Sequence, residues 1–275
     1  MKDFKLGVQL YSVRDDASRD IEGTLKAVKE MGYDGVELAG LYGKTPEELK
    51  SLAESFGLTV ISAHTGLWET RGSSAKAVTE QYRRAGCRYI AIAALGNEDR
   101  PGGENFENAW AEIAELAEAC KEEGMTLLYH NHDFEFAILP DGRTSLEAIY
   151  GCASPELFQT EIDVCWAKTA GNDPAALVRK YAGRAPLVHL KDFSGVPDQS
   201  RYDGAGLKFT RPADAAPFSL QPVGRGEQDI PAILAAAEEA GSEWLIVEQD
   251  SPAEGDTPME SIAYSATYLT TLLGR

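Results

Sequence analysis

The sequence has little positive charge. Lys and Arg number 26 against 44 Asp and Glu in 275 residues, which gives a formal net charge of −18 at pH 7. Because binding to a phosphate backbone depends on positive charge, this balance disfavours nucleic acid as a partner. No GxGxxG follows the first strand-like segment, which disfavours an open dinucleotide-binding sheet.

Long apolar runs and paired cysteines are missing as well. No apolar run approaches the roughly 20 residues that a membrane-spanning helix needs, and the first residues lack an apolar signal core with a cleavage site. The four cysteines are far apart and form no CxxC pair, so we expect buried thiols in a reducing compartment. These absences predict a cytoplasmic protein without a membrane partner, and they leave a homo-oligomer open.

What is present is an alternation of strand-like and helix-like segments along the chain. The predicted strands are residues 6–11, 35–38, 59–64, 89–95, 126–132, 158–164, 186–191 and 243–248. The predicted helices are residues 20–31, 46–56, 74–85, 106–123, 145–150, 174–181, 228–240 and 258–273. Eight strands alternating with eight helices predict an α/β protein that is a single (β/α)8 TIM barrel over residues 1–275, in preference to an open doubly wound sheet.

One long segment interrupts this alternation. Residues 193–227 are rich in Pro, Gly and Asp and show no helical periodicity. Loops of this length in a compact domain are usually functional or disordered. Because the segment follows the carboxyl end of a strand, we expect an ordered loop over the active-site face rather than a plain insertion.

Residues that bind metals stand near the ends of several predicted strands. His130 and His132 end one apolar run, and Asp163, His189 and Glu248 each follow another. The carboxyl ends of the strands in a parallel barrel meet on one face. We therefore expect these residues to meet around one ion, and the mixture of carboxylates and imidazoles suits Mn, Mg, Co or Zn.

Alternation along the strands groups further polar residues. His130 and His132 share a face, so one can ligate a metal while the other transfers protons; a pair of core histidines is the alternative. Lys191 shares the face of His189, where it would stabilise an enolate oxygen, and a surface ion pair is the equal alternative. Glu161 shares the face of Asp163 and is left open as a ligand, a general base or a partner of Lys191.

Polar and aromatic residues elsewhere predict a pocket the size of a sugar. Trp68, Trp166 and Phe193 are placed to stack on a sugar ring, although packing is the more frequent role of such residues. The residues expected to bind the substrate are Gln9, Tyr11, Glu37, His64, Glu135 and Trp166.

As a set, these segments resemble the sugar-phosphate isomerase and epimerase superfamily, whose members are xylose-isomerase-like barrels. That superfamily includes ketose epimerases, inosose dehydratase, dehydroshikimate dehydratase and apurinic-site endonucleases. The resemblance covers essentially the whole chain. The segments that carry it are GVQLYSVRD at 7–15, GVEL at 35–38, SAH at 62–64, YHNHDFEF at 129–136, EIDV at 161–164, HLKD at 189–192, GRGE at 224–227 and VEQD at 247–250.

The resemblance implies a metal held by residues on the fifth to eighth strands. Asp163, His189 and Glu248 match three of the four ligand positions of the superfamily residue by residue. Where many members have Glu-x-His, this chain has His130-Asn131-His132. His130 is therefore predicted to replace the glutamate.

Two alternatives and one further departure accompany this assignment. Glu135 or Glu161 is the alternative to His130 as the fourth ligand. Trp166 stands where several epimerases and dehydratases have a histidine, which argues against a two-glutamate epimerase mechanism and against dehydroshikimate dehydratase activity.

The resulting prediction is a divalent-metal-dependent isomerase or epimerase of a sugar or keto-sugar, with Mn as the expected ion. The reaction removes a proton next to a carbonyl and passes through an enediolate. Because imidazole titrates near working pH, His132 is the expected base, with Glu161 or Glu135 next. Loss of a β-hydroxyl or glycosidic oxygen from the same enediolate gives the alternative, a keto-sugar dehydratase or lyase; a sugar-binding barrel without turnover is the third.

Overall fold

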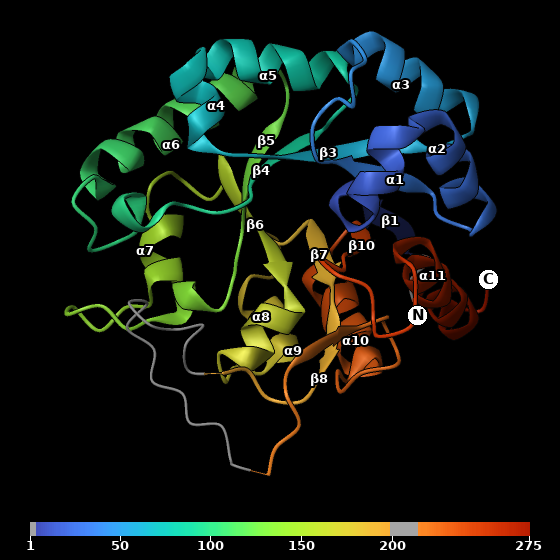
Figure 1. The fold of residues 1–275 in the computed structure, drawn as a ribbon. Coiled ribbons are helices and arrows are strands. Elements are labelled where there is room, and N and C mark those ends of the chain that lie inside the picture. The colour runs from blue at the N-terminus through green and yellow to red at the C-terminus, as the bar shows by residue number, and fades with distance from the viewer. Residues whose placement is uncertain (1–3, 199–213) are drawn as a thin grey trace.

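A closed barrel of eight parallel strands forms the centre of the computed structural model, which describes residues 4–198 and 214–275. Around the barrel the strand order is β1-β10-β7-β6-β5-β4-β3-β2. Helices surround these strands (Figure 1), so the predicted TIM barrel is confirmed. The barrel strands are β1 Lys5–Gln9, β2 Gly35–Leu38, β3 Thr59–Thr65, β4 Tyr89–Ile92, β5 Thr126–His130, β6 Phe158–Asp163, β7 Leu187–Leu190 and β10 Trp244–Val247.

The helices follow the strands and begin at recognisable capping residues. Thr45, Thr144 and Thr257 each precede a helix and form a capping box with the glutamate three residues later. No helix in the described residues is both long and apolar enough to cross a membrane. The helices are α1 Arg14–Arg19, α2 Ile21–Glu30, α3 Pro46–Ser55, α4 Leu67–Gly72, α5 Ala75–Arg84, α6 Phe106–Glu122, α7 Ser145–Tyr150, α8 Val164–Thr169, α9 Pro174–Lys180, α10 Ile230–Ala240 and α11 Pro258–Leu273, with 3-10 turns η1 Leu10–Val13, η2 Asn97–Asp99 and η3 Phe134–Phe136.

Three short helices and the ends of several strands differ from the sequence-based expectation, and the fourth strand ends at Ile92, three residues before the predicted end. The helices α1, α4 and α8 have six residues each and were not predicted from the sequence. The first strand ends at Gln9, because the side chain of Gln9 accepts a hydrogen bond from the Tyr11 backbone N–H and the chain turns into η1. The fifth strand ends at His130, two residues before the predicted end.

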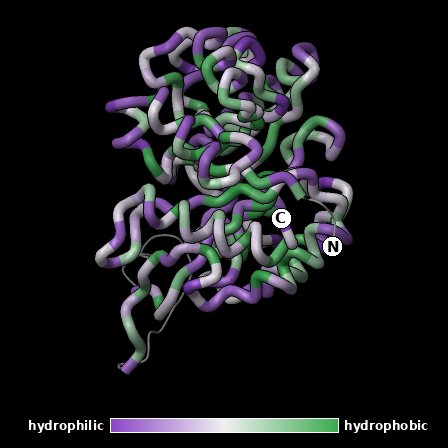
Figure 2. Tube along the Cα trace, turned by 90° about the vertical axis from the view of Figure 1, so that its right-hand side faces the viewer, coloured by the Kyte–Doolittle hydropathy of each residue, from purple (hydrophilic) through white to green (hydrophobic). Residues whose placement is uncertain are grey.

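Apolar side chains fill the lower part of the barrel. The hydrophobic residues in Figure 2 gather along the central strands, while the outer turns are largely hydrophilic. Gly7 leaves space for this packing, since a Cβ there would lie 2.5 Å from the Ile61 side chain. The buried residues inside the barrel are Ile61, Tyr89, Ala91, Leu128, Leu187, Trp244 and Ile246.

Inward-facing side chains change from apolar to polar toward the carboxyl ends of the strands. Leu128 is followed two residues later by His130, and Ile246 by Glu248. Residues two apart in a strand lie on the same face, so the polar members stack above the apolar ones. This collects the charged residues on the face where TIM-barrel enzymes have their active sites.

The predicted loop at residues 193–227 is described at its two ends. There, β8 Asp192–Ser194 pairs antiparallel with β9 Ser219–Gln221. The buried carboxylate of Asp192 accepts backbone N–H groups of Gly224 and Gly226 at 3.0 and 3.1 Å, which anchors the return of the chain. Residues 199–213, the middle of the predicted loop, lie outside the described residues.

Candidate metal centre and active site

Four side chains from neighbouring strands converge at the carboxyl-end face of the barrel. They are His130, Asp163, His189 and Glu248, here named the upper cage; each offers one ligand atom, and these atoms lie within 4.8 Å of one another. His130 Nε2 lies 3.8 Å from Asp163 Oδ2 and 3.8 Å from Glu248 Oε2. The structure thus brings together the four residues that were predicted to hold the metal.

Asp163 is held in place by its neighbours on both sides. The Asn131 side chain donates to the Asp163 carbonyl and accepts from its N–H, at 3.2 and 3.1 Å, which clamps the ends of β5 and β6 together. Asp163 Oδ1 accepts the Trp166 backbone N–H at 2.9 Å and so caps α8. The other oxygen, Oδ2, is buried and lies 3.2 Å from Lys191 Nζ and 3.8 Å from His130 Nε2, inside the cage.

Lys191 places its ammonium group among carboxylates of the upper cage. Its side chain is 1% exposed, and its Nζ lies 2.9 Å from Glu248 Oε2, 3.2 Å from Asp163 Oδ2 and 3.2 Å from Asp250 Oδ2. Burial lowers the pKa of Lys191, but these carboxylates raise it well above its ordinary value, so the ammonium stays charged. The structure therefore places Lys191 inside the site and not in a surface ion pair.

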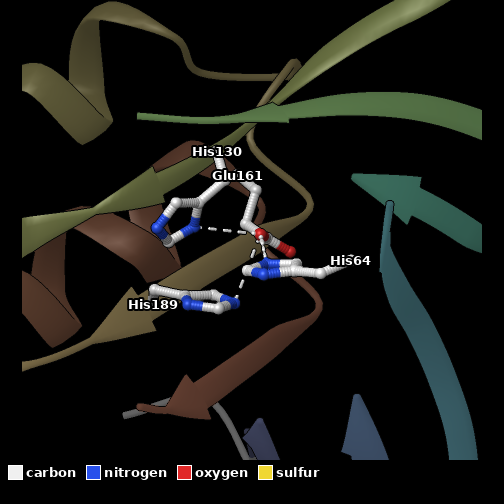
Figure 3. A group of neighbouring side chains, drawn as sticks. All are labelled: His64, His130, Glu161 and His189. Atoms are coloured by element: carbon white, nitrogen blue, oxygen red, sulfur yellow. Dashed lines mark hydrogen bonds and ion pairs between the residues drawn. The ribbon is translucent and has the colours of Figure 1, made fainter. Parts of the chain in front are cut away.

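A second group of residues lies beneath the upper cage and shares two of its imidazoles. Its members are His64, His130, Glu161 and His189, here named the lower cage. Figure 3 shows three imidazoles directed at one oxygen of Glu161. Glu161 Oε2 lies 2.7 Å from His64 Nε2, 3.1 Å from His130 Nδ1 and 3.3 Å from His189 Nε2.

Buried carboxylates stand behind the imidazoles of the upper cage. His189 Nδ1 faces Glu248 at 3.0 Å, while its Nε2 lies 2.7 Å from Glu37. Metal-ligating histidines are usually held in this way by a carboxylate on the second ring nitrogen. Gln9 donates to Glu37 at 2.9 Å, so Gln9 and Glu37 lie beneath the cavity and support His189 instead of forming the cavity wall.

The network leaves an excess of buried negative charge. It contains the buried carboxylates of Glu37, Glu161, Asp163 and Glu248, with the partly exposed Asp250 at its edge, against the ammonium of Lys191 and the imidazoles of His64 and His189, whose pKa values these carboxylates raise. Buried charges are expensive unless they are paired. Two imidazoles and two carboxylates are a donor set that divalent transition ions accept, so the residues of the upper cage fit a metal ion.

The imidazoles differ in their tendency to carry a proton. Burial lowers the pKa of His130 to about 3, which leaves the neutral ring that a metal ligand needs. Burial also opposes protonation of His64, but the carboxylates of Glu37 and Glu161 raise its pKa to about 9.

A cavity opens above both cages. Its volume of about 620 Å³ falls within the roughly 300–1,000 Å³ that small-molecule sites occupy. Tyr11 and Trp68 stand at its rim with 44% and 73% of their surfaces exposed. The remaining lining residues are Ala39, Gly40, His64, Thr65, Glu69, Ala93, Ala94, His130, His132, Glu248 and Asp250.

His132 borders this cavity and a neighbouring one of about 430 Å³. Its half-buried ring stacks on Phe134 at 5.1 Å and on Trp166 at 5.8 Å between ring centroids. Glu135 accepts the His132 backbone N–H and the Tyr129 hydroxyl, both at 2.7 Å, and burial raises the pKa of Glu135 to about 7. Trp166 and Glu135, both expected to bind the substrate, thus contact His132. Of these two residues, Trp166 lines the smaller cavity and Glu135 lines neither cavity.

Two charged residues that line the main cavity were not singled out from the sequence. Asp250 pairs with Lys191, and its position two residues after Glu248 was an available signal, since the two would share a face if the strand continued. Glu69 belongs to α4, which the sequence did not predict, so no pattern pointed to it.

The family model described as a xylose isomerase-like TIM barrel matches residues 25–271. The rhizopine catabolism protein MocC of Rhizobium meliloti is 26% identical over 261 residues, which cover 87% of this chain and 77% of that protein. An inosose dehydratase of Geobacillus kaustophilus is 23% identical over 219 residues, 69% of either chain.

Solved structures share the fold. A sugar phosphate isomerase/epimerase from Parabacteroides distasonis superposes with a TM-score of 0.75 at 22% identity, covering 98% of this chain and 94% of that one. The IOLI protein with a bound zinc atom gives a TM-score of 0.69 at 16% identity, covering 98% of each chain.

Proposed function

The chain belongs to the xylose isomerase-like TIM barrel family, and on this premise we propose that it is a divalent-metal-dependent isomerase or epimerase of a sugar or keto-sugar. The reaction begins with removal of a proton next to a carbonyl. The observation that carries the proposal is the upper cage of buried donors beneath a cavity that has His132 in its wall.

The metal ligands in this proposal are the four residues of the upper cage, His130, Asp163, His189 and Glu248. A divalent ion, when bound, supplies Lewis-acid chemistry that draws electrons from a carbonyl oxygen and makes the neighbouring C–H more acidic. Mn suits the mixed nitrogen and oxygen donors, and Mg, Co and Zn are the alternatives.

His132 is the group that takes the proton in this proposal. Its ring borders the cavity and is held between Phe134 and Trp166, which supports a fixed orientation toward a bound substrate. The carboxylates of Glu161 and Glu135 are buried and absent from the residues that line the cavity, which favours His132 over both as the base. A positioned imidazole titrates in the range that proton transfer needs.

Lys191 does not line the cavity, and its positive charge acts from beside the upper cage, where it offsets the negative charge that forms when the proton leaves. Its charged ammonium lies among the carboxylates of Asp163, Glu248 and Asp250, beside the upper cage. A fixed positive charge in a site shielded from water favours a developing negative charge more than it would in solvent.

The lining of the cavity supports a polyhydroxylated substrate. Tyr11 and Trp68 at the rim offer aromatic faces, on which the C–H surface of a sugar ring packs. His64, Glu69 and Asp250 also line the cavity and offer hydrogen-bonding groups. A few polar groups in an otherwise apolar pocket are the usual means of orienting a small ligand.

A dehydratase is the second candidate function. It is favoured by the similarity to an inosose dehydratase, a protein named for water loss. The first step is the same proton removal; a hydroxyl group on the β-carbon then leaves as water, and a carbon–carbon double bond forms.

The two functions are separated by incubating the protein and Mn²⁺ in deuterated water with inososes, ketohexoses and 3-keto-glycosides. An isomerase or epimerase incorporates deuterium next to the carbonyl and returns a product that has lost no atoms other than the exchanged hydrogen. A product lighter by one water favours the dehydratase. No metal-dependent exchange in any bound compound contradicts both and favours a sugar-binding barrel without turnover.

A further inference from the structure

The lower cage has the ligand set of a metal site in its own right. Three ring nitrogens, from His64, His130 and His189, surround Glu161 Oε2, and the ligand atoms of the group lie within 4.8 Å of one another (Figure 3). The three rings approach one another with centroids 4.7 to 5.3 Å apart. His64 also lines the main cavity, which gives an ion a path to the group.

The two cages use opposite nitrogens of the same two imidazoles. His130 turns Nε2 toward Asp163 in the upper cage and Nδ1 toward Glu161 in the lower cage. His189 turns Nδ1 toward Glu248 above and Nε2 toward Glu161 below. Because a neutral imidazole has one lone pair and one N–H, each ring can ligate on one side and donate on the other. An ion in one cage therefore withdraws both rings from the other cage.

Two observations favour a cation in the lower cage. Glu161 is buried and its second oxygen, Oε1, accepts no hydrogen bond from the described residues, so the charge of this carboxylate is offset from the side of Oε2, where the three imidazoles lie. The upper cage already has the Lys191 ammonium 2.9 Å from Glu248, and this charge lowers the affinity of the upper cage for an ion without preventing its binding. Ligation by His64 displaces its proton, as metal binding to histidine does.

We propose that the lower cage is an alternative metal site that competes with the upper cage for a single ion, according to the chemistry of the ion. Its three imidazoles and one carboxylate make it richer in nitrogen than the two imidazoles and two carboxylates above. Nitrogen donors favour Zn²⁺ and Cu²⁺ over Mn²⁺. Zn²⁺ thus binds in the lower cage and Mn²⁺ in the upper one, and this assignment does not depend on which reaction the protein catalyses.

The test is calorimetric titration of metal-free protein with Zn²⁺ and with Mn²⁺, using two matched variants. His64→Gln removes an imidazole ligand of the lower cage and keeps an N–H donor toward Glu161. Asp163→Asn removes a carboxylate of the upper cage and keeps an oxygen for the N–H of Trp166. Wild-type protein is expected to bind one equivalent of either ion, and Cu²⁺ bound to it should show three nitrogen ligands by electron paramagnetic resonance.

His64→Gln is expected to lower the affinity for Zn²⁺ by more than about 100-fold, which exceeds the 10–100-fold loss typical when a residue that only hydrogen-bonds to a metal ligand is replaced. The same variant is expected to lower the affinity for Mn²⁺ by less than about tenfold. Asp163→Asn should lower the affinity for Mn²⁺ more than the affinity for Zn²⁺. Parallel loss of both ions in both variants contradicts the proposal, as does binding of two equivalents of Zn²⁺ by the wild type. Circular dichroism shows whether each variant folds. If one variant does not fold, the other variant tests the proposal, which is contradicted if that variant loses affinity for Zn²⁺ and Mn²⁺ to the same extent.

Discussion

Replacing Glu135 by Gln should change how the stability of the protein depends on pH. Glu135 is 1% exposed, and burial raises its pKa from 4.5 to about 7 even though it accepts hydrogen bonds from Tyr129 and from the His132 backbone. A carboxyl group whose pKa is raised by folding is best tolerated in its neutral form. Its contribution to stability is therefore fully present below pH 4.5 and is lost as the pH rises through 7.

The size of this loss follows from the two pKa values. With 4.5 in the unfolded chain and about 7 in the folded protein, ionisation of Glu135 should cost about 2.5 kcal/mol more at pH 8 than at pH 5. Gln keeps an oxygen for the His132 N–H and an amide that can donate to the Tyr129 hydroxyl, and it carries no charge at either pH. The variant should thus gain about that amount relative to the wild type between pH 5 and pH 8.

Urea unfolding of both proteins at pH 5, 6, 7 and 8 measures this difference. Other titrating groups act on both proteins alike, so only the difference between the two free energies of unfolding is informative. A difference that stays constant across the range would show that Glu135 is not a neutral buried acid near pH 7, and the description of its surroundings would be wrong.

Three further substitutions test the site. His132→Gln should lower turnover by about 10²–10⁴-fold with Mn²⁺ content unchanged, because proton transfer by a positioned side chain contributes that much; loss of the metal would instead make His132 a ligand. Asn131→Ala leaves the Asp163 N–H and carbonyl unpaired and should cost about 1–3 kcal/mol in urea unfolding, and a cost below about 0.5 kcal/mol would show that the clamp is unimportant. Trp68→Ala should raise KM about 2- to 10-fold, from an aromatic contact of about 0.5–1.5 kcal/mol, and leave kcat unchanged; a fall in kcat alone would refute its role in substrate binding.

The sequence predicted the barrel and the family because both depend on patterns that repeat along the whole chain. The membership of the upper cage was also accessible, since Asp163, His189 and Glu248 all stand where apolar strands end. Parallel strands bring such ends to one face whatever the details of packing. Strand alternation placed His130 and His132 on this face, and the resemblance to the family pointed to His130 as the ligand.

The depth of each side chain in the barrel was not accessible from the sequence. Gln9 and Glu37 have the polar character of pocket residues, yet they lie beneath His189. Depth depends on the register between strands, which includes a shift between Val36 and Glu37 where β2 pairs with β3. Glu161 likewise lies two residues before Asp163, which is about 6–7 Å deeper along a strand.

Local turns explain the other differences. Tyr11 was expected on the inward face of a strand, but the hydrogen bond from its N–H to the Gln9 side chain turns it to the rim of the cavity. The helix α8 begins directly after β6, with Asp163 as its N-terminal cap. Because no loop separates the strand from the helix, the sequence pattern of the helix was not distinguished from that of the strand. Asp163 both caps α8 and belongs to the upper cage, and the sequence alone cannot distinguish such a carboxylate from one that has only one of these two roles.

The most direct test of the central claim is solvent exchange by metal-loaded and metal-stripped protein. A keto-sugar that the protein binds is incubated in deuterated water with each form, and proton magnetic resonance follows the hydrogen on the carbon next to the carbonyl. Our account predicts that this hydrogen is replaced by deuterium in the Mn²⁺-loaded protein and retained in the protein treated with chelator. Equal exchange in both forms, or no exchange with the loaded form while the keto-sugar is bound, would contradict it.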